Sequence, residues 1–192
     1  MRKIELRRKT KETDIKLALN LDGNRTIDVS TGVGFFDHML TLFAFHGGFD
    51  LKIACVGDVD VDDHHTVEDV GIVLGDALHN LLADKVGVRR YGFAYIPMDE
   101  SLARVVIDLS NRPTLVYRAA LDRQKLGQMD TQNVKEFLRA FVNTARITLH
   151  AEVLYGENDH HKVEAIFKAL GRALRSATTI DDGAVPSSKG VL

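Results

Sequence analysis

The sequence predicts an α+β protein made of two internally duplicated half-domains, each a small sheet with two helices on one face. Three observations predict this fold class. Segments in which apolar residues alternate, as in half-buried strands, are interspersed with segments whose apolar residues recur every three or four positions, as in amphipathic helices. These segments follow the same order in both halves of the chain. The five-residue pattern H-H-x-x-E also occurs once in each half, at His64–Glu68 and at His160–Glu164.

The first half, residues 1–92, is expected to run strand, strand, helix, strand, helix. A turn at Asp22-Gly23-Asn24 separates the first two strands, and Gly47-Gly48 closes the first helix. A loop rich in Asp, residues 57–63, leads into the first motif helix. The expected elements are strands at 14–21 and 26–29, a helix at 35–46, a strand at 51–55 and a helix from 64 to about 85.

The second half, residues 93–192, repeats this order. Single positions also match, because Glu12-Thr13 and Glu100-Ser101 each precede the first expected strand of their half. His38 likewise precedes the first motif much as Glu136 precedes the second. We therefore expect a duplication with its boundary near Gly92 and the two halves packed as one unit. The expected elements are strands at 102–109 and 115–119, a helix at 134–143, a strand at 147–153 and a helix from 160 to about 176.

Composition is that of an ordinary soluble globular protein. The 192 residues are 45% hydrophobic and 27% charged, with a formal net charge of −2, which favours neither a nucleic-acid nor a membrane partner. No apolar run is long enough to span a membrane, and the start of the chain lacks a signal-peptide hydrophobic region. The single cysteine, Cys55, excludes an internal disulfide and lies on the apolar side of a strand. These features predict a cytoplasmic location.

The two H-H-x-x-E motifs have the residue types and spacing of metal ligands. Adjacent helical residues point about 100° apart, so the two histidines of a pair should serve different ions. Glu68 follows His64 by four positions and His65 by three, so its carboxylate can join one histidine at one metal. Four imidazoles and two carboxylates are too few for two six-coordinate ions. Further ligands must come from elsewhere in the fold, from another subunit, or from substrate and water.

The motifs have a simpler interpretation as surface histidines near a helix start, with Glu placed to favour the helix dipole. Duplication of the pattern favours the metal interpretation, since two chance occurrences at equivalent places are far less frequent than one. A set of imidazoles and carboxylates without cysteine disfavours a structural zinc site of the Cys type. It suits manganese, iron or zinc, and the spacing does not choose among them.

Five motifs carry a resemblance to a known family. They are F-D-H-M-L at 36–40 followed by His46-Gly47, D-D-H-H-T-V-E-D at 62–69, P-M-D-E at 97–100, the second H-H-x-x-E, and P-S-S-K-G at 186–190. On these motifs the chain resembles the imidazoleglycerol-phosphate dehydratase family of histidine biosynthesis over essentially its whole length. The resemblance implies a duplicated fold similar to ribosomal protein S5 domain 2. It implies a hydro-lyase that converts D-erythro-imidazole glycerol phosphate to imidazole acetol phosphate and water, with two manganese ions per active site. It also implies a homo-oligomer of twenty-four chains built from trimers.

The resemblance also implies roles for individual residues. Many relatives have His at the position of Glu136, where a carboxylate is still a competent ligand for manganese. Glu12, Glu68 and Glu164 are the expected catalytic carboxylates, with Glu12 the first candidate for acid–base work. The implied metal ligands are His38, His64, His65, Glu68, Glu136, His160, His161 and Glu164. The implied substrate contacts are Glu12, His38, His46, His64, His65, Arg90, Arg112, His160, His161, Lys168, Ser187, Ser188 and Lys189.

Two other functions compete with this one. A metal-storage protein would explain the histidine pairs but not the basic residues or the Ser-Lys tail. A metal-dependent hydrolase would need a metal-bound water as its nucleophile. Taken singly, Arg90 and Arg112 fit ordinary surface charges, and the tail fits a frayed terminus.

Overall fold

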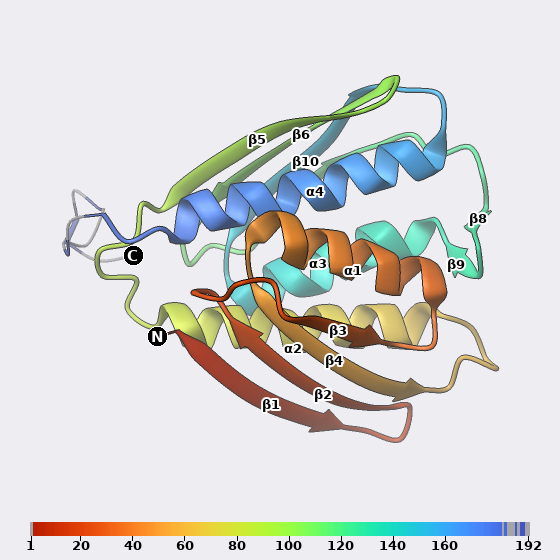
Figure 1. Ribbon diagram of the computed structural model, residues 1–192, viewed down its shortest axis with the longest axis horizontal. Coiled ribbons are helices and arrows are strands. Elements are labelled where there is room, and N and C mark those ends of the chain that lie inside the picture. The colour runs from red at the N-terminus through yellow and green to blue at the C-terminus, as the bar shows by residue number, and fades with distance from the viewer. Residues whose placement is uncertain (1, 182, 184–186, 188, 191–192) are drawn as a thin grey trace.

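The computed structural model describes residues 2–181, 183, 187 and 189–190 of the chain. Within these residues, two four-stranded sheets enclose a layer of four helices (Figure 1). The first sheet contains β1 (Lys3–Lys9), β2 (Thr13–Asn20), β3 (Ile27–Ser30) and β4 (Asp50–Gly57), in the order β1-β2-β4-β3. The second contains β5 (Tyr91–Met98), β6 (Ser101–Asp108), β7 (Thr114–Arg118) and β10 (Thr148–Tyr155), in the order β5-β6-β10-β7.

The two sheets have the same topology. In each, the first three strands in spatial order pair antiparallel, and the last pairs parallel to its neighbour. The helices are α1 (Gly34–Gly47), α2 (His64–Leu82), α3 (Gln132–Ala145) and α4 (Asp159–Thr178). The first two cover the first sheet, and the last two cover the second. This repeated arrangement confirms the predicted α+β duplication. No helix in the described part of the chain combines the length and apolar composition that crossing a bilayer requires.

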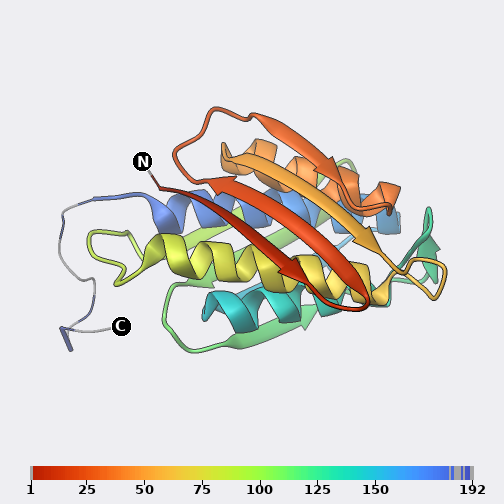
Figure 2. The same cartoon turned by 90° about the horizontal axis from the view of Figure 1, so that it is seen from below.

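The halves meet through their helices. Helix α2 packs against α3, and α4 packs against α1, so each motif helix contacts a helix of the other half. All four helices begin at the same end of the molecule (Figures 1 and 2). A side chain at Gly75 of α2 would lie 2.5 Å from the Phe141 carbonyl oxygen, and one at Gly171 of α4 would lie 2.3 Å from that of Phe43. Each glycine comes seven residues after the Glu of its motif, so the close approach is itself duplicated.

Replacing Gly171 by Ala should destabilise the fold, because its new methyl group would overlap the backbone of α1. We expect a loss of about 1–3 kcal/mol in the free energy of unfolding, as for other overpacked core sites. Chemical denaturation measures it. The matched control is Gly34→Ala, at the first position of α1, where an added Cβ meets nothing within 4 Å. Equal stability of the two variants would show that the helices do not need this close contact.

The sequence prediction missed the first strand of each sheet. In β1 the half-buried positions include Ile4 and Leu6, but Arg8 continues that face, so the alternation is masked by charge. The basic residues Arg7, Arg8 and Lys9 end β1, and the turn that follows leads into β2. In β5 the buried positions are the small residues Gly92 and Ala94, while aromatic residues face outward. Both strands lie at sheet edges, where one-sided burial weakens the apolar pattern.

Smaller differences concern element ends. Helix α2 ends at Leu82 rather than near Lys85, because Ala83 and Lys85 adopt positive φ angles of 44° and 58°. The segment between β7 and α3, where no strand or helix was expected, contains β8 (Lys125–Leu126), which pairs with β9 (Met129–Asp130). The predicted boundary near Gly92 falls inside β5. The division into units 1–92 and 93–192 stays a prediction.

Candidate metal centre

Each H-H-x-x-E motif lies in the first turns of its helix. The two rings of a pair diverge, as helix geometry predicts, with planes at 80° for His64 and His65 and at 85° for His160 and His161. Their ring centroids are 6.1 and 6.2 Å apart. The two histidines of each motif therefore face different surroundings, and one ion would not bind both in this geometry.

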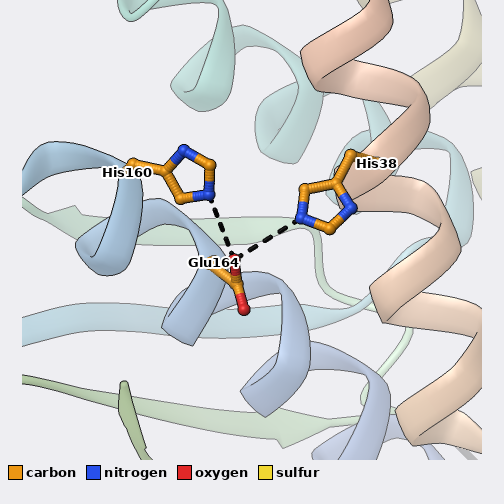
Figure 3. Close-up of side chains that lie close together, drawn as sticks. All are labelled: His38, His160 and Glu164. Carbon is orange, nitrogen blue, oxygen red and sulfur yellow. Dashed lines mark hydrogen bonds and ion pairs between the residues drawn. The ribbon is translucent and has the colours of Figure 1, made fainter. Parts of the chain in front are cut away.

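The second motif meets His38 of the first half (Figure 3). Nε2 of His160 lies 3.2 Å from Oε2 of Glu164, and Nε2 of His38 lies 3.5 Å from the same oxygen. One potential ligand atom from each residue lies within 4.8 Å of the others, and no second group of three or more such residues occurs in the described ranges. His38 comes from α1 and the other two from α4, so the packing of these helices across the halves builds the cluster.

Lys168 forms an ion pair with the carboxylate of this cluster. Its Nζ lies 2.5 Å from Oε1 of Glu164, one turn along α4. Burial raises the pKa of the Glu164 carboxyl, but the hydrogen bond and charge of Lys168, with smaller contributions from His160 and His38, hold that pKa below its ordinary value. Glu164 is therefore ionised at neutral pH, which is the form that binds a cation.

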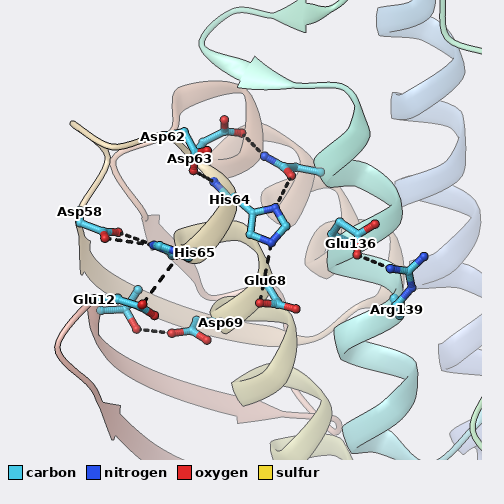
Figure 4. A network of polar contacts seen from close by, with 12 residues as sticks. Glu12, Asp58, Asp62, Asp63, His64, His65, Glu68, Asp69, Glu136 and Arg139 are labelled. Carbon is cyan, nitrogen blue, oxygen red and sulfur yellow. Dashed lines mark hydrogen bonds and ion pairs between the residues drawn. The ribbon is translucent and has the colours of Figure 1, made fainter.

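The first motif faces Glu136 in an equivalent way. Nε2 of His64 lies 3.9 Å from Oε2 of Glu68, and Figure 4 shows Glu136 across from them on α3. The Glu136 carboxylate pairs with Arg139 at 2.6 Å. Within the described structure, the donor groups of His64, Glu68 and Glu136 do not converge as tightly as those of the cluster at the second motif. The matching positions of His38 and Glu136 thus each lie beside the motif of the opposite half.

The second histidine of each motif contacts a carboxylate through Nδ1. That of His65 lies 3.0 Å from Asp58, and that of His161 lies 2.7 Å from Glu100. These hydrogen bonds are the main cause of the raised pKa of each imidazole. Sequence reasoning gave no role to Asp58 or Glu100. Two features of the sequence could have identified these residues: the position of Asp58 in the Asp-rich loop and the match of Glu100 to Glu12.

Glu12 lies in the turn between β1 and β2, close to the first motif. Its Oε1 is 3.9 Å from Nε2 of His65, and its side chain is about half exposed.

His46 lies in the last turn of α1, two turns beyond His38. Burial lowers the pKa of the His46 imidazole, and the charges of Lys168 and Arg172 lower it further. Lys168 also donates to Sδ of Met98 at 3.4 Å.

Two of the basic residues expected to bind substrate, Arg90 and Arg112, lie near the end of α4, away from the histidine motifs. Arg90 donates to both carboxylate oxygens of Asp108, at 2.7 and 3.2 Å, and Arg112 lies 3.6 Å from the same group. The Arg90 amide donates to the carbonyl of Ala177, near the end of α4. Ala177 follows His160 by 17 residues, a rise of roughly 25 Å along the helix.

The tail residues are only partly described. The Lys189 amide donates to Oγ of Ser187 at 3.3 Å, forming a local turn. Ser188, and the Pro186 that begins the P-S-S-K-G motif, lie outside the described residues. Their expected role in binding substrate stays a prediction.

The fold and the cluster together define a class: a duplicated α+β protein with an imidazole–carboxylate site of the kind that holds a divalent cation. The chain belongs to the imidazoleglycerol-phosphate dehydratase family, whose model matches residues 31–174. This confirms the resemblance seen in the motifs. Membership makes the chain an enzyme, a lyase with dehydratase activity in histidine biosynthesis.

Individual relatives are similar over their full length. The imidazoleglycerol-phosphate dehydratase of Clostridioides difficile (strain 630) is 58% identical over 192 residues, with 100% of both chains covered. That of Bacillus subtilis (strain 168) is 57% identical over 194 aligned residues, again with 100% of both covered. Among solved structures, the Staphylococcus aureus enzyme matches with a TM-score of 0.84 and 46% identity, covering 93% of this chain and 99% of that one. The Pyrococcus furiosus enzyme matches with a TM-score of 0.84 and 40% identity, covering 97% and 100%.

Proposed function

We propose that the protein catalyses the metal-dependent dehydration of D-erythro-imidazole glycerol phosphate to imidazole acetol phosphate, with two manganese ions per active site. The convergence of His38, His160 and Glu164 from the two halves carries the proposal. Two imidazoles and a carboxylate, without cysteine, suit manganese. The equivalent grouping of His64, Glu68 and Glu136 would serve the second ion. His65 and His161 diverge from His64 and His160, so each would bind a different ion from the one that its neighbour in the motif binds.

The chain's own carboxylates and bases would move the protons. Bound manganese would supply Lewis acidity towards the substrate's imidazole. Glu12 is free to approach the substrate from the turn between β1 and β2, where it can protonate the departing hydroxyl or accept the carbon proton. Glu68 and Glu164 would keep the reacting groups in place as metal ligands. His46 and Lys168 would contact the substrate, and Arg90, Arg112 and the tail residues Ser187, Ser188 and Lys189 would bind its phosphate.

The same proposal includes a homo-oligomer, with trimers assembling into a particle of twenty-four chains. The basic residues at Arg90 and the imidazoles at His160 are separated by most of the length of α4, roughly 25 Å. A substrate whose phosphate and imidazole are only a few bonds apart would not reach both ends of one chain, so another copy would supply one end. The outer face of the second sheet supports association, since Tyr91, Phe93 and Tyr95 leave aromatic rings in water, with Phe93 70% exposed. A cytoplasmic location completes the proposal.

Product identity tests the reaction. Metal-loaded protein incubated with imidazole glycerol phosphate should form a ketone, detected chemically or by mass as the loss of one water. A storage protein would give no turnover. A hydrolase would release inorganic phosphate and leave no ketone. Either of those outcomes contradicts the proposed reaction.

Glu136 should contribute to metal binding despite its departure from the histidine that many relatives have. Glu136→Ala should lower manganese affinity by about tenfold or more, whereas Glu136→His should largely retain it. Elemental analysis under limiting metal measures the content. Glu5→Ala, which removes an exposed carboxylate from β1, is the matched control. Equal metal content in Glu136→Ala and wild type would exclude Glu136 as a ligand.

A further inference from the structure

The second histidine of each motif is oriented by a carboxylate that comes from outside its helix. The His161 ring contacts Oε2 of Glu100 at 2.7 Å, and the His65 ring contacts Asp58 at 3.0 and 3.2 Å, in both cases through Nδ1. An imidazole whose Nδ1–H donates to a carboxylate has its lone pair on Nε2, the atom that then faces a metal. The two contacts therefore select the same tautomer in both halves.

Glu100 is itself held firmly. Its Oε1 accepts backbone N–H groups of Glu157 at 3.1 Å and Asn158 at 2.8 Å, and the hydroxyl of Ser101 at 2.9 Å. Glu157 and Asn158 form the connection that leads directly into α4. One carboxylate thus fixes both the start of the motif helix and the ring of its second histidine.

The residue of the first half that matches Glu100 is Glu12, but its carboxylate makes a different contact with the motif histidine. Glu12 precedes Thr13, the first residue of β2, as Glu100 precedes Ser101, the first residue of β6. Its carboxylate lies on the Nε2 side of His65, at 3.9 Å, and makes no Nδ1 contact. Asp58 takes that contact instead, and its backbone N–H donates to the Glu12 carbonyl at 3.1 Å.

The lengths of two loops explain why a loop residue, Asp58, contacts Nδ1 in the first half and a hairpin residue, Glu100, does so in the second. The connection between β4 and α2 spans residues 58–63, whereas the connection between β10 and α4 spans only 156–158. The longer loop begins with Asp58, directly after the strand. The shorter one has Gly156 at that place, where even a Cβ would lie 2.2 Å from Oγ of Ser101. The second half therefore has no room for an orienting side chain at Gly156. Glu100, in the hairpin between β5 and β6, makes the contact with His161 instead.

We propose that Asp58 and Glu100 are equivalent positioning residues, each holding the second histidine of its motif with Nε2 ready for metal, and that Asp58 thereby releases Glu12 to act on the substrate. The inference rests on the proposed function, because it assumes that His65 and His161 bind manganese. It assigns opposite roles to two residues at one duplicated position: Glu100 orients a ligand, and Glu12 is left for chemistry.

The test is manganese binding to the full-length protein, measured by calorimetry and by the electron paramagnetic resonance of free manganese. Asp58→Asn and Glu100→Gln should each lower the affinity for one of the two manganese ions by about 10- to 100-fold and leave the affinity for the other ion unchanged. Asp60→Asn, in the same loop, and Glu157→Gln, beside Asn158, are matched controls that should leave both ions unchanged. Thermal unfolding of each variant shows whether the fold is intact.

Unchanged affinity for both ions in Asp58→Asn and Glu100→Gln would overturn the inference. Equal weakening of both ions together with a lowered unfolding temperature would also overturn it, since that is the signature of a purely structural role. Absence of manganese binding by the wild-type protein would instead contradict the proposed function, and the inference would fall with it.

Discussion

Replacing Glu12 by Gln is expected to lower kcat by about 10²- to 10⁴-fold, the range typical of losing a general acid or base. Glu12 lies 3.9 Å from Nε2 of His65 and is half exposed in the hairpin turn, so it can reach a substrate bound beside the first motif. The amide keeps the size of the side chain but can neither give nor take the proton. Steady-state kinetics on metal-loaded protein measures the effect.

Metal content must be measured on the same samples, because Glu12 is not proposed as a ligand. Glu5→Gln, an exposed carboxylate in β1, is the control and should keep normal kcat. Wild-type turnover in Glu12→Gln with normal metal content would show that another group performs the acid–base step. A fall in turnover that only follows lost metal would assign Glu12 to binding instead.

Two inactive variants should restore each other's activity when their chains are mixed in one particle. Glu164→Ala removes a ligand from the metal end of the site, and Arg112→Ala removes a basic residue from the phosphate end, which lies at the other end of α4. If each site takes one end from each of two copies, random mixing in equal amounts rebuilds about a quarter of the sites. Co-expression with two different tags and purification on both gives the mixed particles for assay.

Mixing His38→Ala with Glu164→Ala is the matched control. These residues belong to one cluster within one chain, so neither variant can supply the intact cluster that the other lacks. Mixed Glu164→Ala and Arg112→Ala particles that are no more active than the separate variants would contradict a site shared between copies.

The repeated element order was predictable because it depends on local patterns. Alternating residues such as Ile15, Leu17 and Leu19 are buried as expected, and the motif helices begin where the histidines are. Strands β1 and β5 could not be found in this way. The half-buried face of β1 ends in the charged Arg8, the buried positions of β5 are small, and pairing with β2 and β6 makes both segments strands.

The site shows the same division between local and tertiary information. Divergence of His64 from His65 follows from helix geometry alone. The meeting of His38 with Glu164 does not, because it depends on α1 of one half packing against α4 of the other. The contacts of Asp58 and Glu100 with the motif histidines likewise depend on tertiary structure, because the loops at 58–63 and 156–158 differ in length.

The most direct measurement is a manganese titration of chelator-treated protein, with ketone formation and bound metal followed together. We expect turnover to be lost on chelation and to return with added manganese, reaching its maximum at two ions per chain. Magnesium, which binds imidazole-rich sites weakly, should not restore it. Full turnover by metal-free protein would contradict a metal-dependent dehydration.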